Sequence, residues 1–245
     1  MKQVILTVRA NEPIAKNVWR MTLAGDVSDV SRPGQFVNLK LDGFYLRRPL
    51  SVYDKREGTL TVIYKTVGDG TRALSEYGTG KEIDCLVGLG NGYDTAPSGD
   101  RPLLVGGGVG VPPLYWLART LIAEGKTVTA ILGFNTKDEV FAEEEFRALG
   151  AKVTVTTADG SYGQKGFVTD ALPGLDYTYF YTCGPEPMLR ALNRAAKTDG
   201  QFSFERRMGC GFGACMGCSC KTITGYKRIC REGPVLERKE ILWED

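Results

Sequence analysis

Five of the seven cysteine residues lie between positions 210 and 230. Cys210, Cys215 and Cys218 follow the spacing C-x4-C-x2-C, and Cys230 stands further along the chain. This is the spacing of a plant-type [2Fe–2S] site, in which four thiolates hold two iron ions. The pattern therefore predicts a cluster at these four cysteines and a protein that handles electrons one at a time.

Glycines between these cysteines allow the loop to curl tightly. Four of them can take positive φ values and bring backbone N–H groups to the sulfur atoms: Gly209, Gly211, Gly213 and Gly217.

Zinc and disulfides are the alternatives for these cysteines. Structural zinc sites usually have two short C-x2-C steps, and only one is present here. The odd number of cysteines and the lack of a recognisable signal peptide favour a reducing cytoplasm, where disulfides are rare. Cys220 could replace Cys218 or Cys230 as a ligand. We prefer Cys218 because it keeps the recurring spacing, and interpret Cys220 as a packed thiol beside the cluster.

A glycine loop follows a short apolar strand, Leu103–Val105, and precedes a helix that begins near Pro112. The loop contains Gly107, Gly108 and Gly110, and it would leave room for a pyrophosphate at the N-terminus of the helix. It lacks the G-x-G-x-x-G fingerprint, so an ordinary strand-to-helix turn is the alternative.

Cys183 and Gly184 end a later strand, at the edge of a parallel sheet where ligands bind. A small thiol there could lie against a nicotinamide ring, although many cysteines are simply buried. Nearer the N-terminus, Arg48 suits a diphosphate, Ser51 could bond the edge of a flavin ring, and Gly70-Thr71 offers a second phosphate site. The alternative for this last group is a solvated Arg47-Arg48 pair beside an ordinary strand.

The chain of 245 residues contains no histidine. Its absence excludes Ser-His and Cys-His catalytic pairs, histidine bases and Rieske clusters, so cofactors are expected to carry the chemistry. The net charge is +2, which gives no strong attraction to nucleic acid or a membrane surface. No apolar stretch reaches the roughly eighteen residues that a membrane span needs. We expect a cytoplasmic redox protein that binds neither nucleic acid nor a membrane.

Three units should position these residues. Residues 1–97 predict an antiparallel β domain that suits a small barrel, and residues 98–200 alternate strands with helices, as in a doubly wound parallel sheet. Residues 201–245 form a third unit that is too small to hold a core without its metal. Strands are expected at 4–9, 18–24, 35–41, 51–53, 59–66, 103–105, 128–132, 153–156 and 177–182, and helices at 71–77, from 112, 139–148 and 185–197.

The order of these motifs resembles the ferredoxin–NADP⁺ reductase superfamily. The cysteine-rich segment narrows the resemblance to the electron-transfer, or iron–sulfur, subunits of bacterial dihydroorotate dehydrogenase B. The matching stretches are RRPLSV at 47–52, GDGTRALS at 68–75, LLVGGGVGVPPL at 103–114, ADGSYGQKGFVTD at 158–170, CGPEPML at 183–189 and ERRMGCGFGACMGC at 205–218.

The resemblance implies three cofactor sites. FAD would bind the barrel at Arg48, Pro49, Leu50, Ser51, Ile63, Tyr64, Lys65, Gly70 and Thr71. NAD would bind at Gly107, Gly108, Gly110, Cys183 and Gly184. The [2Fe–2S] cluster would bind Cys210, Cys215, Cys218 and Cys230. NAD is favoured over NADP because acidic residues, Asp138 and Glu139 among them, would repel a ribose 2′-phosphate.

The resemblance also implies a partner, an FMN-containing catalytic subunit that oxidises dihydroorotate in pyrimidine synthesis, with two of each chain. Electrons would pass from FMN through the cluster and FAD to NAD⁺, and no catalytic residue for proton abstraction is expected in this chain. Apolar residues near the cluster, Met208, Phe212 and Met216, are candidates for the partner contact or for packing over the cluster.

The alternatives keep the fold and change the role. A flavin and iron–sulfur subunit of another complex, such as an NADH–ferredoxin transhydrogenase or a sulfide or hydrogenase complex, would use the same cofactors. Some of those relatives have an aspartate ligand, whereas four cysteines are available here. A zinc-stabilised adaptor on an inactive reductase scaffold is the third possibility.

Overall fold

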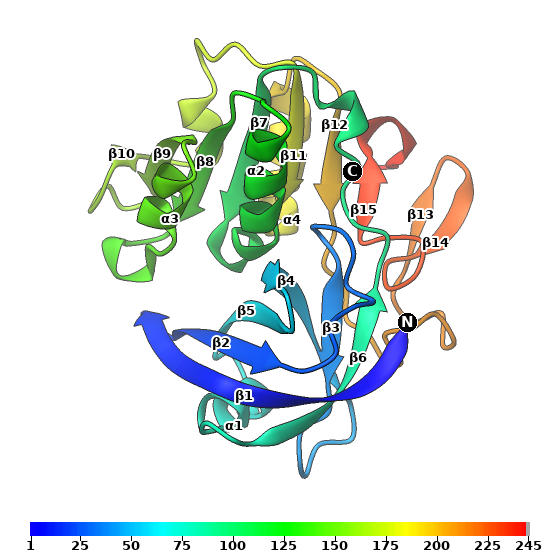
Figure 1. Ribbon diagram of the computed structural model, residues 1–245. Helices are drawn as coiled ribbons and strands as arrows, with labels where there is room; N and C mark the ends of the chain where they lie inside the picture. Colours follow the sequence, from blue (N-terminus) through cyan, green and yellow to red (C-terminus); the bar gives the residue numbers. More distant parts are fainter. Residues whose placement is uncertain (244–245) are drawn as a thin grey trace.

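The computed structural model describes residues 1–243 and begins with a closed antiparallel barrel (Figure 1). Neighbouring strands of the barrel follow the order β1-β2-β5-β4-β3-β6. Alternate side chains of these strands, such as Leu6, Val8, Val37 and Leu39, fill its core, as the period of two in a strand requires. The strands are β1 (Lys2–Ala15), β2 (Val18–Ala24), β3 (Phe36–Leu39), β4 (Arg48–Arg56), β5 (Thr59–Lys65) and β6 (Glu82–Leu89), and α1 (Asp69–Ser75) lies between β5 and β6.

A mostly parallel sheet follows the barrel, in the order β10-β9-β8-β7-β11-β12-β15. Only β15 pairs antiparallel within the part of this sheet that the structure describes. Its strands are β7 (Pro102–Gly107), β8 (Thr129–Phe134), β9 (Lys152–Thr157), β10 (Gln164–Lys165), β11 (Tyr179–Cys183), β12 (Gly200–Ser203) and β15 (Val235–Glu237). The main helices are α2 (Pro112–Ala123), α3 (Glu143–Ala148) and α4 (Glu186–Ala195).

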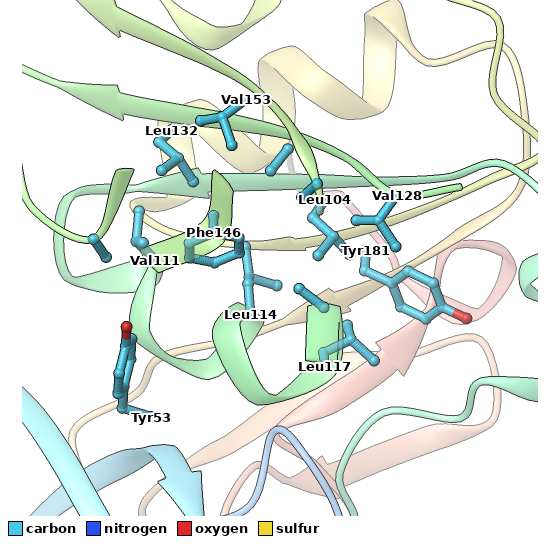
Figure 2. Close-up of a cluster of buried hydrophobic side chains, with 14 of the residues drawn as sticks. Tyr53, Leu104, Val111, Leu114, Leu117, Val128, Leu132, Phe146, Val153 and Tyr181 are labelled. Carbon is cyan, nitrogen blue, oxygen red and sulfur yellow. The ribbon is translucent and has the colours of Figure 1, made fainter. Parts of the chain in front are cut away.

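Helices cover both faces of this sheet. Leu104 and Leu132 pack with Leu114 and Leu117 of α2 on one face (Figure 2), whereas Leu103 and the apolar residues of α4 belong to a core on the other. Burial on both faces explains why every residue of β7 is buried. None of the helices within residues 1–243 is long and apolar enough to cross a membrane.

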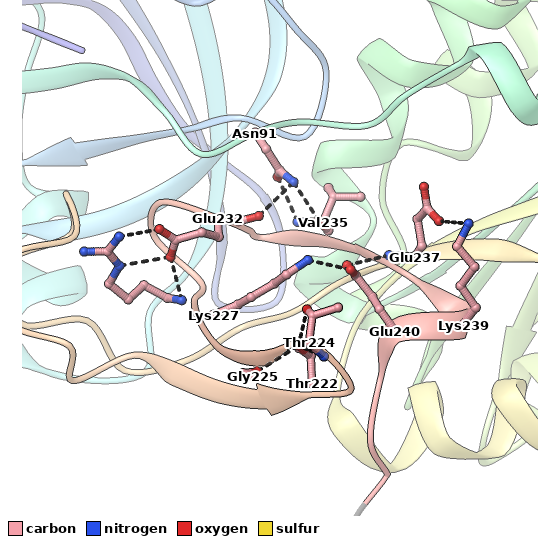
Figure 3. A network of polar contacts seen from close by, with 11 residues as sticks. Asn91, Thr222, Thr224, Gly225, Lys227, Glu232, Val235, Glu237, Lys239 and Glu240 are labelled. Carbon is pink, nitrogen blue, oxygen red and sulfur yellow. Dashed lines mark hydrogen bonds and ion pairs between the residues drawn. The ribbon is translucent and has the colours of Figure 1, made fainter.

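The C-terminal segment packs against the second face of the sheet. Its hairpin, β13 (Ser219–Thr222) with β14 (Gly225–Arg228), is tied to the short turn η5 (Arg238–Glu240) by the ion pair of Lys227 with Glu240 (Figure 3). Cys218, Ile229 and Cys230 share a buried cluster with Phe36 of the barrel and Phe202 of β12. The segment therefore uses the core of its neighbours.

The barrel and the sheet are joined by a partly buried polar and aromatic contact. Tyr53 of β4 stacks on Tyr115 of α2, with ring centroids 4.3 Å apart. Arg119 of α2 pairs with Asp54 at 2.6 Å, and Arg20 of β2 pairs with Glu145 of α3. These contacts fix how the barrel faces the sheet.

The predicted fold class is confirmed, and several elements differ from the expectations. The helix expected over 139–148 is broken: the turn η3 (Lys137–Glu139) and α3 flank Ala142, whose φ is +63°. Strand β6 was not expected, because Glu82 and Asp84 hide an alternation that buries every second residue. Strands β12 and β15 join the sheet, although residues 201–245 were expected to form a separate unit. Residues 244 and 245 of that unit lie outside the described part. The domain boundaries stay a prediction.

Candidate functional site

Three adjoining cavities run from the edge of the sheet to the barrel. The first, here called the sheet cavity, measures about 410 Å³ and lies at the carboxyl ends of β7, β8 and β9. Its lining includes Gly107, Gly108, Phe134, Asn135, Thr156, Phe167 and Met188.

The second, the central cavity, measures about 180 Å³ and contains residues of both domains. It shares Gly107, Gly108, Phe134, Asn135 and Pro185 with the sheet cavity. Lys65 of the barrel forms an ion pair of 2.7 Å with Glu139 across it, and Glu139 also accepts a hydrogen bond of 2.8 Å from Asn135 Nδ2.

The third, the barrel cavity, measures about 300 Å³ and shares Lys65, Val109 and Glu205 with the central cavity. The three cavities therefore adjoin one another in a row that passes the glycine loop. Its lining includes Phe36, Pro49, Leu50, Ser51, Ile63, Tyr64, Thr71, Cys183, Ser203, Met208 and Pro234.

Glycine is needed at different positions of the loop for different local reasons. A Cβ on Gly110 would lie 2.3 Å from the carbonyl oxygen of Cys183, so Gly110 lets the loop pack against the neighbouring strand end. Gly108 has a φ of +53° and faces open space, where the backbone can meet a ligand. Gly184 lines the central cavity, so the loop and the end of β11 meet there.

Cys183 is buried, and its side chain lies beside the barrel cavity with Ser203. Burial raises the pKa of its thiol well above the ordinary value, so the group stays protonated and neutral. A neutral, compact side chain at this position suits contact with a flat ring.

The predicted flavin residues fall into two groups. Seven line the barrel cavity: Pro49, Leu50, Ser51, Ile63, Tyr64, Lys65 and Thr71. Arg48 and Gly70 lie together outside that lining, since a Cβ on Gly70 would be 2.3 Å from Arg48 Nε. Arg47 is held by Asp84 at 2.9 Å, so Arg48 is the arginine placed beside α1.

Two of these side chains already have local partners. Thr71 Oγ1 accepts hydrogen bonds from the backbone of Val67 and Gly68, which caps α1. The hydroxyl of Tyr64 donates to Asn11 at 2.9 Å within the barrel. The phosphate role expected of Thr71 and the flavin role expected of Tyr64 stay predictions, and both hydroxyls already have partners within the protein.

The cysteine loop brings its thiols together in pairs. Cys210 Sγ accepts hydrogen bonds from the backbone of Ala214 (3.2 Å) and Cys215 (3.4 Å), and Cys215 Sγ accepts one from Cys210 N (3.5 Å). Cys218 Sγ accepts one from Cys230 N at 3.4 Å. Burial opposes ionisation of Cys210, but the N–H groups lower its pKa to about 6.

These donors fit a thiolate-bound cluster. Burial above all, then the hydrogen bond and charge of Cys218 and the charge of Cys210, raise the pKa of Cys230 to about 12, so a bound cation would favour its thiolate form. Within residues 1–243, no three acidic or thiol groups are already gathered in a metal-binding geometry. The loop supplies the ligand set and its N–H donors, and the metal would close it.

The loop glycines differ partly from the expectation. Gly211 and Gly213 have positive φ values of +75° and +96°, whereas Gly209 and Gly217 do not take such values. Met216 does, with a φ of +60°. A non-glycine residue in this region is strained, and such strain often marks a functional loop.

Cys220 has different surroundings from the other four cysteines. It lies on β13 and lines a separate cavity of about 270 Å³ with Arg206 and Trp243. Burial raises the pKa of its thiol.

Sequence reasoning missed several lining residues. Glu205 lines both the central and the barrel cavities, and desolvation among surrounding protein atoms raises the pKa of its carboxyl. Its place two residues after the end of β12 could have indicated this, had β12 been predicted. Phe134 and Asn135 carry no motif signal, whereas Phe167 lies in the matching stretch 158–170 but was given no role. Met208 lines the barrel cavity, in contrast to its expected place in an exposed patch, while Phe212 and Met216 are exposed.

Comparisons with known proteins agree with this geometry. The family model "Iron-sulfur cluster binding domain of dihydroorotate dehydrogenase B" matches residues 205–242, and "Oxidoreductase NAD-binding domain" matches residues 104–194. The dihydroorotate dehydrogenase B (NAD(+)) electron transfer subunit of Geobacillus sp. (strain WCH70) is 45% identical, with 99% of each chain covered. The protein of the same name from Fusobacterium nucleatum is also 45% identical, with 96% of each covered.

Solved structures show the same fold. A structure of NADH-dependent reduced ferredoxin-NADP oxidoreductase aligns with a TM-score of 0.88 at 32% identity, covering 98% of this chain and 90% of that chain. The cytochrome P450 reductase GcoB of Amycolatopsis aligns with a TM-score of 0.70 at 24% identity, covering 79% of this chain and 66% of that chain.

Proposed function

Because the chain belongs to the family of dihydroorotate dehydrogenase B (NAD(+)) electron transfer subunits, we propose that it carries electrons from a catalytic partner subunit to NAD⁺. The partner oxidises dihydroorotate in pyrimidine synthesis. The observation that carries the proposal is the row of adjoining cavities, whose barrel end is lined by Met208, two residues before the first cysteine of the loop. When bound along that row, a flavin exchanges single electrons with an iron–sulfur cluster and a hydride with nicotinamide.

The sheet and central cavities would hold NAD. Gly107 and Gly108 expose backbone at the junction of these two cavities, where a pyrophosphate would fit. Lys65 supplies a positive charge there and offsets the repulsion between a phosphate and Glu139. Cys183 and Gly184 would lie by the nicotinamide.

The barrel cavity would hold the flavin ring of FAD. Its floor is made by Pro49, Leu50, Ser51 and the strand Ile63–Lys65, and Arg48 beside Gly70 would hold the diphosphate. The apolar residues exclude water, and Ser51 can offer a hydrogen bond to a ring edge.

Cys210, Cys215, Cys218 and Cys230 would hold the [2Fe–2S] cluster. Cys218 and Cys230 are 2% exposed and anchor one side of the site in the buried core. Backbone N–H groups of the loop point at Cys210 and stabilise negative charge on sulfur.

We further propose that the partner is the FMN-containing catalytic subunit and that the complex holds two of each chain. The chain contains no histidine, and the row of cavities offers Cys183 only as a protonated thiol, so proton abstraction from dihydroorotate belongs to the partner. The exposed side chains of Phe212 (42%) and Met216 (51%) are the proposed contact surface, since both flank the cysteine ligands.

The first experiment measures dihydroorotate-dependent reduction of NAD⁺ under anaerobic conditions, with and without the FMN subunit encoded in the same genome. We expect NADH only when both chains are present. A preparation that holds FAD and iron, oxidises NADH with ferricyanide and still shows no coupling would contradict the proposal. It would favour the alternative of another flavin and iron–sulfur complex, to which the 0.88 alignment with the ferredoxin-NADP oxidoreductase gives support.

A further inference from the structure

Asn38 is a polar residue in an otherwise apolar strand. Its neighbours Val37 and Leu39 fill the barrel core, whereas Phe36 packs on the opposite side with Cys218 and Cys230. Since side chains alternate along a strand, Asn38 shares the side of Phe36, which faces the C-terminal segment. The side chain is almost completely buried, with 1% exposed.

The amide of Asn38 contacts the backbone of a predicted cluster ligand. Asn38 Nδ2 donates a hydrogen bond to the carbonyl oxygen of Cys210 at 3.3 Å. The loop is pressed close at this point, because a Cβ on Gly211 would lie only 2.3 Å from Asn38 Nδ2. Gly211 also has a φ of +75°, so both the contact and the backbone conformation favour glycine.

The other end of the amide is a buried polar atom without a partner. Among residues 1–243, Asn38 Oδ1 makes no hydrogen bond. Such an atom destabilises the fold, and an apolar residue of similar size would avoid this cost. Asparagine at position 38 therefore lowers the stability of the fold and provides the contact to the cysteine loop.

The backbone of Asn38 is held from the barrel side. Its carbonyl oxygen lies 3.4 Å from Arg47 Nη1, and Arg47 is fixed by two hydrogen bonds of 2.9 and 3.0 Å to the carboxylate of Asp84. Across the β3–β4 pairing, Asn38 stands opposite Pro49, which lines the barrel cavity. One residue thus touches the cysteine loop and belongs to the strand pair that walls the cavity.

We propose that Asn38 is a positioning residue that holds the Cys210 end of the cysteine loop against the wall of the flavin cavity and so controls electron transfer between the two. This inference rests on the proposed function, because it needs a cluster on the loop and FAD in the barrel cavity. With both groups bound, one electron would pass between them in each transfer. The amide itself gains and loses neither electron nor proton; it sets distance and orientation.

The test uses the purified protein with FAD and cluster, as wild type and as Asn38→Leu. Leucine keeps the branched shape and the number of side-chain heavy atoms, and it removes the N–H donor. Three quantities are measured: iron and FAD content, the electron paramagnetic resonance spectrum of the dithionite-reduced cluster, and the rate of cluster reduction after mixing with NADH. We expect unchanged content, a shifted spectrum, and cluster reduction slowed by roughly tenfold, as when groups that orient metal ligands are removed.

Asn91→Leu is the matched control. Asn91 also ties the barrel side to the C-terminal segment, by bonds of 3.1 Å to Glu232 O and 2.7 Å to Val235 O, but it contacts none of the predicted ligands (Figure 3). We expect its spectrum and its rate of cluster reduction to match the wild type. Equal slowing in both variants would overturn a specific role for Asn38.

The outcomes separate this inference from the proposed function. If NADH reduces the wild-type cluster and Asn38→Leu behaves identically, the role of Asn38 is refuted and the proposed function stands. If the wild-type protein holds no iron, or NADH never reduces its cluster, the proposed function fails first. If the leucine variant does not fold, Asn38→Ala, which also lacks a donor, replaces it, and wild-type behaviour of that protein would again refute the role.

Discussion

Cys218 and Cys220 are separated by one residue but have different surroundings. The buried Sγ of Cys218 accepts a hydrogen bond from Cys230 N, whereas Cys220 faces a separate cavity beside Arg206. We expect Cys218→Ser to lose its iron and Cys220→Ser to retain it, because only the first removes a ligand of the proposed cluster. Iron per FAD and visible absorption measure this. Loss of iron in Cys220→Ser would show that the ligand set is wrong.

Glu205 should make the stability of the protein depend on pH. Desolvation raises its pKa in the folded state above the ordinary value of 4.5. The folded protein therefore disfavours the charged carboxylate, and the stability present below pH 4.5 is lost as the pH rises through the folded pKa. Because its side chain keeps contact with solvent, Glu205→Gln should then unfold at only slightly higher denaturant concentration than the wild type at pH 8, with the difference vanishing near pH 4.5.

Tryptophan fluorescence in a urea titration of the FAD-free protein measures this effect. Glu144→Gln, at an exposed position of α3, is the control and should follow the wild type at both pH values. A constant difference between Glu205→Gln and the wild type across the pH range would mean that the carboxyl is not desolvated.

At the scale of single residues, the sequence patterns predicted the site residues that lie close to one another along the chain. The cysteine spacing and the glycine loop are local patterns, because a compact ligand needs several groups from one segment. Asn38 and Glu205 have no such pattern. Asn38 is 172 residues from Cys210, and only the packing of the C-terminal segment on the barrel brings them together. Contacts of that kind depend on tertiary structure, which periodicity does not report.

At the scale of elements, the contact between β4 and α2 should control both stability and nucleotide binding. Arg119 Nη2 forms an ion pair with Asp54 at 2.6 Å and donates a hydrogen bond to the carbonyl oxygen of Lys55 at 2.9 Å, and the Asp54 side chain is only 12% exposed. Arg119→Met should lower the free energy of unfolding by about 2 kcal/mol, between the values for exposed and fully buried pairs. It should also raise the KM for NADH, because residues of both domains line the central cavity.

Arg101→Met provides the comparison for this interface. Arg101 pairs with Asp176 at 3.1 Å, but the two side chains are 51% and 79% exposed. We expect its stability to stay within about 0.5 kcal/mol of the wild type and its KM to be unchanged. Equal losses in the two variants, by denaturant titration, would mean that burial of the Asp54 pair adds nothing.

The strands and helices were predicted best where one pattern dominates. The fully apolar β7 and the apolar face of α2 are such elements. Strand β6 carries acidic residues on its exposed side, and β12 and the edge strand β15 are short strands whose pairing comes from distant parts of the chain. The break at Ala142 is a backbone feature that the acidic helical pattern of 139–148 does not reveal.

At the scale of the whole molecule, the cavities and the cysteine loop occupy different structural units. The cavities are walled mainly by the barrel and the sheet. Among the predicted cysteine ligands, Cys218 and Cys230 lie in the core under α4, whereas Cys210 and Cys215 belong to none of the three cores. Between Arg207 and Cys230, Met208 is the one residue that lines the barrel cavity. Nucleotide and flavin binding should therefore be separable from the cluster.

Removal of the iron by a chelator under reducing conditions tests this separation. We expect the protein to keep FAD and to oxidise NADH with ferricyanide at an almost unchanged rate, while dihydroorotate-dependent NAD⁺ reduction with the partner is lost. Ile229 should stay packed in the core, whereas the segment from Arg206 to Gly217 loses the bound iron that would fix it. Trypsin should then cut after Arg206 or Arg207 faster than in the iron-loaded protein. If FAD dissociates together with the iron, the loop is part of the flavin site, and Met208 is the first residue to examine because it lines the barrel cavity.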